Sequence, residues 1–285
     1  MHRILSNEVL APDVHRLWVE APHVIRKRRP GQFVIVRASE DGERIPLTIA
    51  DVDPARGAIA LVIQGVGKTT MFINELPAGG SLLDVVGPLG RPTRIEPGSR
   101  VCCVGGGIGT AVVYPIACGV KSLGGRVVSI VGGRTRDLVI LEAEMRHVSE
   151  QCIVTTDDGS YGMKGLVTDA LVELLDKGEV FDEVVAVGPL PMMRAVCDVT
   201  RSRNVPTIVS LNPVMVDGTG MCGGCRVQVG GEQKFVCVDG PEFDGHQVDF
   251  DGLAARLRAY REQEAAALVQ FRRDHDLECE AMGTV

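Results

Sequence analysis

The sequence contains few aromatic residues. Phe, Trp and Tyr together make up 4 % of its 285 residues, and Trp18 is the single tryptophan. Apolar residues nevertheless reach 45 %, so Val, Ile, Leu and Ala must supply the core. An aliphatic core of this kind is typical of sheets covered by helices. The composition therefore argues against an aromatic-rich secreted module.

The sequence also lacks long apolar runs and an excess of positive charge. It has no run of about 18 apolar residues, and residues 1–20 mix charged with apolar side chains, so neither a membrane span nor a signal peptide is predicted. The net charge of −7 makes nucleic acid and anionic membranes poor candidates as partners. We expect a soluble, cytoplasmic protein whose nine cysteines are not paired in disulfides.

Residues 1–97 have the pattern of a small antiparallel β-barrel. Short apolar stretches alternate with turn signals such as Arg29-Pro30-Gly31 and Asp41-Gly42. Regular spacing of this kind is typical of a barrel. The expected strands lie at residues 14–19, 32–37, 45–50 and 58–63, with one helix at about 68–76.

Residues 98–212 change to an alternation of strands and helices. This alternation predicts an α/β domain with a doubly wound parallel sheet, beginning after Pro97. The expected strands lie at residues 100–104, 126–131, 151–155, 183–187 and 206–210, and the expected helices at about 110–122, 138–148, 164–177 and 191–203.

Two further segments follow residue 212. Residues 213–250 are rich in glycine, carry cysteines and lack helical periodicity, so we expect a small separate segment, whereas residues 251–285 are expected to form a helical tail. Spacings of three and four positions, interrupted at Glu264, predict one apolar stripe along this tail: Leu253, Leu257, Tyr260, Leu268 and Phe271. The stripe packs either on the chain's own core or on a partner.

A glycine-rich loop connects the first α/β strand to its helix. The loop consists of Gly105, Gly106, Gly107, Ile108, Gly109 and Thr110. Glycine lets a backbone approach a pyrophosphate closely, and the helix that follows offers free N–H groups. Thr110 occupies the third glycine position of the G-x-G-x-x-G motif, so the strict dinucleotide fingerprint is not met. We interpret the segment as a nucleotide-binding loop.

Two other segments also look like parts of nucleotide sites. Asp157 and Asp158 follow the third expected α/β strand, where carboxylates would accept ribose hydroxyls and repel a 2′-phosphate. They favour NAD over NADP, and a plain acidic turn is the alternative. Gly65-Val66-Gly67-Lys68-Thr69 resembles a P-loop, but Val62 stands where the first glycine of that motif belongs. A Walker A site is excluded, while a binding loop for another phosphate remains an alternative.

The most specific chemical pattern is formed by Asp217, Cys222, Cys225 and Cys237. Plant-type [2Fe–2S] ferredoxins use Cys-x4-Cys-x2-Cys with a distant fourth cysteine. The spacing here, Asp-x4-Cys-x2-Cys-x11-Cys, matches that register if Asp217 replaces the first thiolate. We therefore predict a [2Fe–2S] cluster with these four ligands. Zinc and free thiols stay open as alternatives, although zinc sites favour two cysteine pairs or Cys/His sets.

In its order of barrel, nucleotide domain and cysteine loop, the sequence resembles the ferredoxin-NADP⁺ reductase superfamily. Over about residues 1–250 it is similar to the electron-transfer subunit of dihydroorotate dehydrogenase. It is more similar still to the small subunit of NADH-dependent reduced ferredoxin:NADP⁺ oxidoreductase, also called the sulfide dehydrogenase flavoprotein subunit. The segments that carry the resemblance are residues 44–51, 105–110, 156–162 and 217–237.

The resemblance implies sites for two nucleotides. Thr48 would lie near the isoalloxazine of FAD and Arg44 near its diphosphate, although their spacing is one residue longer than the superfamily's Arg-x-x-Ser/Thr. The residues implied for FAD are Arg44, Pro46, Leu47, Thr48, Gly67, Lys68, Thr69 and Thr70. Those implied for NAD(H) are residues 105–110, Asp157, Asp158, Gly188 and Pro189.

The sequence departs from the family pattern at two informative positions. Many relatives place a cysteine beside the nicotinamide, whereas this chain has Val187, so no catalytic side chain is expected. Dihydroorotate relatives supply four cysteines to the cluster, whereas this chain offers Asp217, as in the transhydrogenase type of complex. A carboxylate stabilises ferric iron relative to a thiolate, so this ligand should tune the cluster's potential.

The resemblance implies an iron–sulfur flavoprotein oxidoreductase that passes electrons between NAD(H), FAD, the cluster and a larger partner subunit. That partner would itself carry FAD and [4Fe–4S] clusters and bind NADP. Three alternatives stay open: the electron-transfer subunit of a dihydroorotate dehydrogenase, a stand-alone NADH-dependent reductase, and a non-redox module with a structural zinc.

Overall fold

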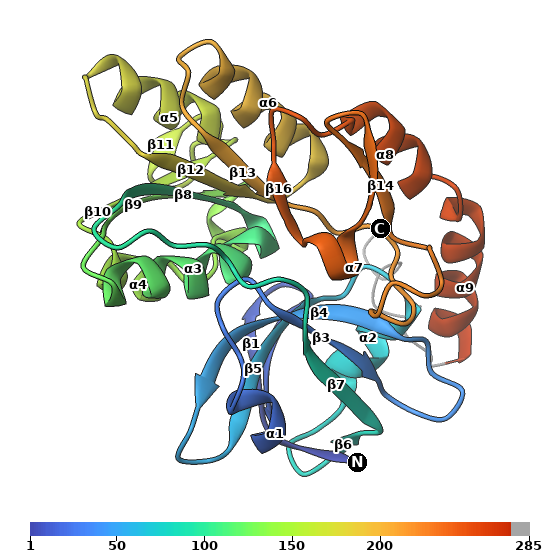
Figure 1. Cartoon of the computed structure of the whole chain (residues 1–285). Coiled ribbons are helices and arrows are strands. Elements are labelled where there is room, and N and C mark those ends of the chain that lie inside the picture. Colours follow the sequence, from blue (N-terminus) through green and yellow to red (C-terminus); the bar gives the residue numbers. More distant parts are fainter. Residues whose placement is uncertain (275–285) are drawn as a thin grey trace, which may run out of the picture.

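The structure, a computed structural model, describes residues 1–274 and shows two sheets stacked one above the other (Figure 1). A cysteine-bearing segment and two helices lie along one side of both sheets. The helical tail expected at residues 251–285 can be compared with the structure as far as Asp274, because residues 275–285 lie outside the described part.

The first sheet is antiparallel and curls into the expected barrel, with strand order β6-β1-β2-β5-β4-β3-β7. Its strands follow the two-residue period of a half-buried sheet. In β2, Leu17 and Val19 are fully buried, whereas Trp18 between them and Arg16 before them remain partly exposed. The elements are β1 (His2–Ala11), β2 (Val14–Glu20), α1 (Pro22–Ile25), β3 (Phe33–Arg37), β4 (Ile45–Asp53), β5 (Ala58–Gln64), α2 (Lys68–Glu75), β6 (Ser81–Leu82) and β7 (Asp84–Leu89).

The second sheet is the expected doubly wound sheet, with strand order β11-β10-β9-β8-β12-β13-β16. Helices α3 and α4 cover one face, and α5 and α6 cover the other (Figure 1). The elements are β8 (Arg100–Gly106), η1 (Gly107–Gly109), α3 (Thr110–Ser122), β9 (Arg126–Gly133), η2 (Arg136–Leu138), α4 (Glu142–Val148), β10 (Gln151–Thr156), β11 (Met163–Lys164), α5 (Val167–Asp176), β12 (Glu183–Val187), α6 (Leu190–Arg201) and β13 (Thr207–Ser210).

The cysteine-bearing segment completes this second sheet. Its last strand, β16 (Glu242–Asp244), pairs antiparallel with β13 at the edge of the otherwise parallel sheet. Before it come the hairpin β14 (Arg226–Val229) and β15 (Glu232–Phe235) and the single turn α7 (Val236–Asp239). The segment is therefore held to the α/β sheet by backbone hydrogen bonds as well as by side-chain packing.

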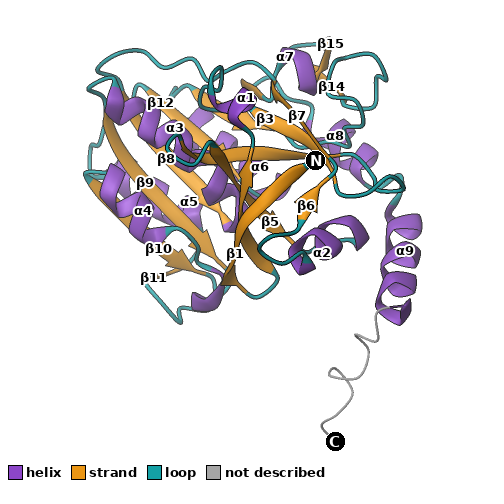
Figure 2. Cartoon of the chain, turned by 90° about the horizontal axis from the view of Figure 1, so that it is seen from below, coloured by secondary structure: helices purple, strands orange, loops and turns teal. Residues whose placement is uncertain are grey.

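The helical tail consists of two helices, α8 (Phe250–Leu257) and α9 (Arg261–Asp274). The prediction that the five apolar residues share one helical face was wrong, because they are divided between two helices and the turn that joins them. Leu253 and Phe271 are buried, but Leu257 and Tyr260 are exposed, because the chain changes direction between the two helices. α9 lies beside α2 of the barrel (Figure 2). In the described part of the chain, no helix is both long and apolar enough to cross a bilayer.

One apolar cluster joins the two sheets and the cysteine-bearing segment. It contains Phe33 and Ile35 from barrel strand β3, Val184 and Val209 from the second sheet, and Cys237 from α7. Buried side chains in such clusters are packed as densely as organic crystals. The barrel strand, the second sheet and the cysteine turn therefore have fixed positions relative to one another.

A polar contact lies beside this junction. Thr93, in the connection between the two sheets, donates its hydroxyl hydrogen to Glu242 Oε1 of β16 at 2.7 Å, and its N–H donates to Pro30 O of the barrel. Burial, with a smaller contribution from Glu183, raises the pKa of Glu242 to about 7, although the hydrogen bond from Thr93 acts in the opposite direction. The Thr93 hydrogen bond favours the ionised carboxylate, but burial outweighs it, so the folded state favours the protonated Glu242 carboxyl.

This contact predicts a pH-dependent stability. The folded-state pKa of Glu242 lies above its unfolded value, so its contribution is fully present below about pH 4.5 and is lost as the pH rises through about 7. Between pH 5 and pH 8 the free energy of unfolding of the wild type should fall by about 1–3 kcal/mol more than that of Glu242→Gln. Thermal unfolding midpoints at both pH values measure this, with the exposed Glu40→Gln as control. Equal pH dependence in wild type and Glu242→Gln would contradict the prediction.

Candidate functional site

A cleft of about 690 Å³ opens at the carboxyl ends of the parallel strands, the edge at which α/β sheets bind ligands. Val14 and Gln64 of the barrel form part of its wall, so the cleft lies between the two sheets. Of the residues predicted for NAD(H), those that line the cleft are Gly106, Gly107, Ile108, Asp157, Gly188 and Pro189. The remaining four, Gly105, Gly109, Thr110 and Asp158, are not among its lining residues.

Close packing explains why three residues of the glycine loop are outside the cleft. A Cβ on Gly109 would stand 2.0 Å from the carbonyl oxygen of Val187, so only glycine lets this turn pack on the end of β12. A Cβ on Gly105 would stand 2.7 Å from Cα of Thr110, which is itself fully buried. These residues bring the start of α3 against the sheet. This packing fixes the position of Gly106 and Gly107, which line the cleft.

The structure separates the two neighbouring aspartates. Asp157 lines the cleft, whereas Asp158 Oδ1 accepts hydrogen bonds from the N–H and the hydroxyl of Ser160. These bonds lower the pKa of Asp158. Asp158 therefore holds the turn, as in the alternative of a plain acidic turn, and Asp157 faces the cleft. Arg134 also lines the cleft, and the sequence analysis missed it.

The two segments implied for FAD lie side by side in the barrel. Thr69 donates its hydroxyl hydrogen to the carboxylate of Glu43, the residue next to Arg44. Thr70 Oγ1 accepts the N–H groups of Val66 and Gly67 at 3.0 Å, so it caps the start of α2. A Cβ on Gly67 would meet nothing within 4 Å, so this helix start, which carries unpaired N–H groups, is open.

The second part of the FAD segment is a partly exposed stretch of β4. Pro46, Leu47 and Thr48 are half-buried, whereas the next two residues of the strand are buried. Thr48 lies opposite Phe33 of β3, and Pro46 lies opposite Ile35. Half-exposed backbone and apolar side chains beside an open helix start fit a ligand with a flat ring and a phosphate. Arg44 is exposed and precedes the strand.

The cysteine loop forms two pairs of candidate ligands. Cys225 and Cys237 are buried, with their sulfurs 3.3 Å apart. Asp217 Oδ2 accepts the N–H of Cys222 at 2.8 Å, and Oδ1 accepts the N–H of Thr219 at 2.8 Å. These hydrogen bonds lower the pKa of Asp217, while burial and the neighbouring Cys225 raise the pKa of Cys237 to about 12.

The separation into pairs bears on the kind of metal. A tetrahedral metal with bonds of about 2.3 Å to sulfur holds its ligand sulfurs about 3.8 Å apart, close to the Cys225–Cys237 spacing. Within residues 1–274, no three His, Cys, Asp or Glu side chains converge on a single ion position. A mononuclear zinc site needs four ligands around one centre, whereas a two-iron cluster needs two ligands on each iron. The arrangement fits the two-iron cluster better.

The cysteine loop is also held against the barrel. Gly218 has φ +76°, and a Cβ there would stand 2.7 Å from Leu89 of β7. Arg91, which follows β7, donates its N–H to Gly240 O at 2.6 Å and its Nε–H to Val238 O at 3.1 Å. These bonds hold the turn that carries Cys237. The cluster site is thus tied to the same end of the barrel as the β3–β4 pair.

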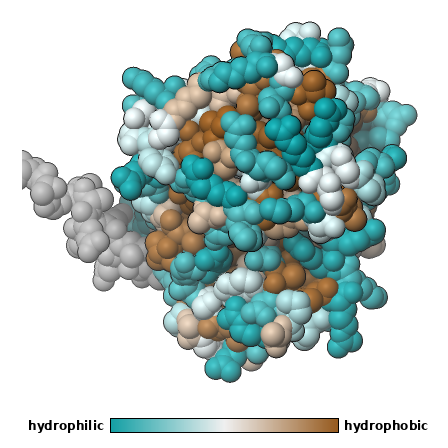
Figure 3. Space-filling model, turned by 90° about the vertical axis from the view of Figure 1, so that its left-hand side faces the viewer, coloured by the Kyte–Doolittle hydropathy of each residue, from teal (hydrophilic) through white to brown (hydrophobic). Residues whose placement is uncertain are grey.

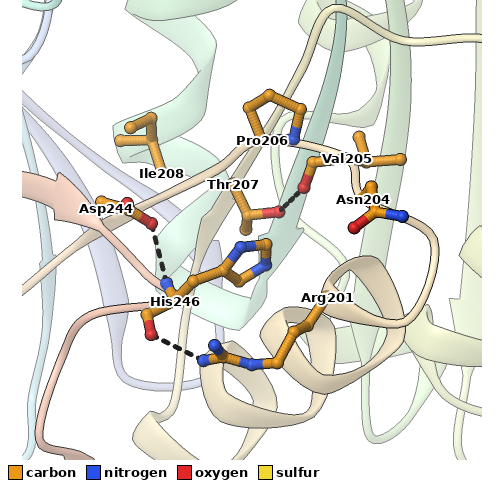
Figure 4. Close-up of a pocket in the computed structure, with 8 residues that line it drawn as sticks. All are labelled: Arg201, Asn204, Val205, Pro206, Thr207, Ile208, Asp244 and His246. Atoms are coloured by element: carbon orange, nitrogen blue, oxygen red, sulfur yellow. Dashed lines mark hydrogen bonds between the residues drawn. The ribbon is translucent and has the colours of Figure 1, made fainter.

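A second cavity of about 430 Å³ lies beside the end of α6, the start of β13 and the end of β16 (Figure 4). Several of its polar groups are already bonded to one another. Arg201 donates to His246 O at 2.7 Å, and His246 N–H donates to Asp244 Oδ1 at 2.9 Å. None of the predicted site residues lines it. We regard this cavity as a structural groove between α6 and the end of β16.

Comparison with known proteins identifies the family. Residues 212–249 match the model of the iron–sulfur cluster binding domain of dihydroorotate dehydrogenase B. The chain is 48 % identical over 271 residues to a homologue of the dihydroorotate dehydrogenase B electron-transfer subunit from Thermotoga maritima, covering 95 % of each chain. The chain belongs to the family of dihydroorotate dehydrogenase B electron-transfer subunits.

Other members of this electron-transfer family confirm the relationship. The electron-transfer subunit of dihydroorotate dehydrogenase B from Geobacillus thermodenitrificans is 35 % identical over 254 residues, with 86 % of this chain and 96 % of the relative covered. A solved chain from the NADH-dependent reduced ferredoxin-NADP oxidoreductase, studied for flavin-based electron bifurcation, superimposes with a TM-score of 0.90 at 48 % identity, covering 95 % of this chain and 98 % of that one. The predicted resemblance is therefore confirmed, and the matched segment contains Asp217 and the three loop cysteines.

Substitutions at Asp217 can separate an iron ligand from a loop-organising residue. If Asp217 ligates iron, Asp217→Cys should keep a cluster with changed g-values and potential, and Asp217→Ala should lose or destabilise it. If Asp217 only accepts the N–H groups of its loop, Asp217→Asn keeps one of the two acceptor oxygens and should retain the wild-type g-values and potential in a less stable cluster, whereas Asp217→Cys, which has no acceptor oxygen, should lose the cluster. Electron paramagnetic resonance of the reduced protein and a redox titration measure both effects. Wild-type spectra from the Cys and Ala variants would mean that the fourth ligand lies elsewhere.

Proposed function

We propose that this chain passes electrons between NADH and a partner oxidoreductase subunit through one FAD and one [2Fe–2S] cluster. One observation carries the proposal: Cys225 and Cys237 share an apolar core with Phe33 and Ile35, which lie opposite Thr48 and Pro46 of the flavin segment. The cluster loop and the flavin strand are therefore separated by one strand of the barrel. Family membership supports an electron-transfer flavoprotein.

The residues of the barrel fit FAD in two places. We assign the helix start at Gly67, Lys68, Thr69 and Thr70 to an FAD phosphate, because its N–H groups face an open cradle. The half-buried stretch Pro46, Leu47 and Thr48 would lie along the flavin ring, with Arg44 at the diphosphate. The hydrogen bond from Thr69 to Glu43 fixes the positions of the two parts of this site relative to each other.

The cleft between the sheets would bind NAD(H). Gly106, Gly107 and Ile108 present backbone to the nucleotide, Asp157 accepts from a ribose, and Gly188 and Pro189 border the far end. When bound, the cofactors supply the chemistry themselves, hydride transfer from NADH to FAD and single-electron transfer to the cluster. The chain's own residues bind and orient. Val187 is buried and apolar, so no acid, base or nucleophile is needed there.

The partner would dock over the cysteine loop. Met221 is 88 % exposed, and Val214, Val216 and Val238 are also exposed in the same segment. Exposed apolar side chains beside a redox site are typical of an interaction surface. The opposite face carries only separate small apolar patches among polar ones (Figure 3). We propose a larger partner with FAD and [4Fe–4S] clusters that binds NADP, and a cytoplasmic location, where thiols stay reduced.

A dihydroorotate dehydrogenase catalytic subunit is the second candidate partner. The names of the relatives from Thermotoga and Geobacillus favour it, whereas Asp217 in place of a fourth cysteine favours the transhydrogenase type. A stand-alone reductase would leave the exposed Met221 without a role. Co-purification from the native host, followed by identification of the bound subunit, distinguishes the three.

The cofactor content tests the proposed function directly. Acid extraction of the purified chain should release about one FAD per chain, and the visible spectrum should show flavin bands with a broad iron–sulfur shoulder. Anaerobic addition of NADH should bleach both. A well-folded preparation that contains only FMN, no flavin, or zinc in place of iron would overturn the proposal.

The nucleotide preference should depend on one of the two aspartates. Asp157 lines the cleft, and its charge would repel a 2′-phosphate, so we expect NADH to be preferred. Asp157→Asn should narrow the preference for NADH over NADPH by about tenfold, which corresponds to about 1.4 kcal/mol. Asp158→Asn is the matched control and should leave the preference unchanged, because Asp158 bonds to Ser160. Steady-state reduction of a dye with each nucleotide measures the ratio. An equal shift from both variants would contradict the assignment.

A further inference from the structure

The charges inside the cleft are few and unsatisfied. Among the described residues that line it, only Arg134 and Asp157 are charged, and the others are glycine, apolar or neutral polar. Within residues 1–274, neither side chain makes an ion pair or a hydrogen bond, with each other or with another residue. A ligand that fills this cleft must therefore offer both an anionic group for the guanidinium and hydroxyl donors for the carboxylate.

The position of Arg134 indicates which group it meets. It follows Gly133 at the end of β9, and β9 lies between β8, which leads into the glycine loop, and β10, which leads to Asp157. The loop after β9 is tied to the loop after β10, because Asp157 N–H donates to Gly133 O at 3.1 Å and Asp158 N–H donates to Arg134 O at 3.2 Å. Arg134 therefore stands between the phosphate-binding backbone and the ribose acceptor.

Neighbouring arginines differ from Arg134 in having partners. Arg136 lies over the ring of Tyr161 at 5.4 Å, and its N–H donates to Ser160. Arg146 pairs with Glu142 at 2.7 Å, and Arg16 pairs with Glu144 at 2.9 Å. Among these arginines in the described part of the chain, Arg134 is the one whose guanidinium pairs with no carboxylate and is therefore available to a ligand.

We propose that Arg134 binds the diphosphate of the adenine nucleotide, while Asp157 accepts hydrogen bonds from its adenosine ribose. This inference rests on the proposed nucleotide-binding function and adds a specific phosphate ligand to it. The planar guanidinium presents two parallel N–H donors, which match two phosphate oxygens. The backbone of Gly106 and Gly107 offers N–H groups to the same diphosphate from the other side. Arg134 thus sets affinity, and Asp157 sets the choice between nucleotides.

Direct binding to the purified chain, with its flavin and cluster in place, tests this assignment without turnover. The probes are ADP and adenosine, and calorimetry gives their dissociation constants. Arg134→Met should weaken ADP binding about 10- to 100-fold, the loss expected for a charged hydrogen-bonded pair, and leave adenosine binding unchanged. Arg134→Lys should keep the charge without the bidentate geometry, so its ADP affinity should lie between those of the wild type and of Arg134→Met.

Arg136→Met is the matched control, because Arg136 is nearby and exposed but does not line the cleft. It should leave the ADP affinity unchanged. The Arg134 variants should not shift the thermal midpoint, since the Arg134 side chain makes no ion pair or hydrogen bond within residues 1–274. If Arg134→Met bound ADP as tightly as the wild type, the inference would be overturned while the proposed nucleotide site would stand. Equal weakening of ADP and adenosine would also overturn it, because the loss would not then be at the phosphate. A wild-type chain that binds no ADP would overturn both the inference and the proposed nucleotide site.

Discussion

The apolar core shared by β3, the second sheet and the two buried cysteines constrains the rest of the molecule. Electron transfer between two cofactors needs a short and constant separation, and a close-packed core supplies it because its side chains cannot shift independently. Phe33 and Ile35 contribute to this core from the strand that pairs with the flavin segment. Cys225 and Cys237 contribute from the other side. The cluster loop is therefore part of the fold rather than an appendage to it.

The nucleotide cleft has the opposite character. Its wall consists of backbone, small residues and loops at the carboxyl ends of strands. Functional residues often lie on such loops, which a rigid sheet holds in position. Gly109 shows how the two are combined, since its missing Cβ lets the start of α3 pack directly on the end of β12. A hydride donor must enter and leave, whereas a cluster must stay. In the proposed function the chain meets both needs, with the donor between its sheets and the cluster at their common core.

The connection between the sheets links these two regions. Arg91 holds the turn that carries Cys237, and two residues later Thr93 bonds to Glu242 of β16 and to Pro30 of the barrel. Hydrogen bonds of this kind contribute about 0.5–1.5 kcal/mol each when they replace bonds to water. Their larger effect is geometric. A change in the angle between the sheets would have to break the contacts of Arg91 with the turn that carries Cys237 and those of Thr93 with Glu242 and Pro30.

Local patterns in the sequence were enough to predict many of the elements. The helix at 110–122 and the central strands of both sheets depend on neighbours within a few residues, which propensity and periodicity describe well, whereas the ten-residue strand β1 was not predicted. The apolar stripe in the tail was wrong at Leu257 and Tyr260, because helical spacing cannot foresee a break between two helices. That break is set by what α8 and α9 each pack against.

Only the tertiary structure separated Asp157 from Asp158, found Arg134 in the cleft, and showed that the cluster residues form two pairs. Adjacent residues of the same type have the same local signal, so the sequence could not tell the one that faces a ligand from the one that holds a turn. Arg134 and Asp157 are brought to the same edge of the sheet because β9 and β10 pair in parallel, which places the carboxyl ends of both strands side by side. The glycine loop after β8 and Gly188 after β12 join them from more distant parts of the chain, so the lining of the cleft exists only once the sheet has formed.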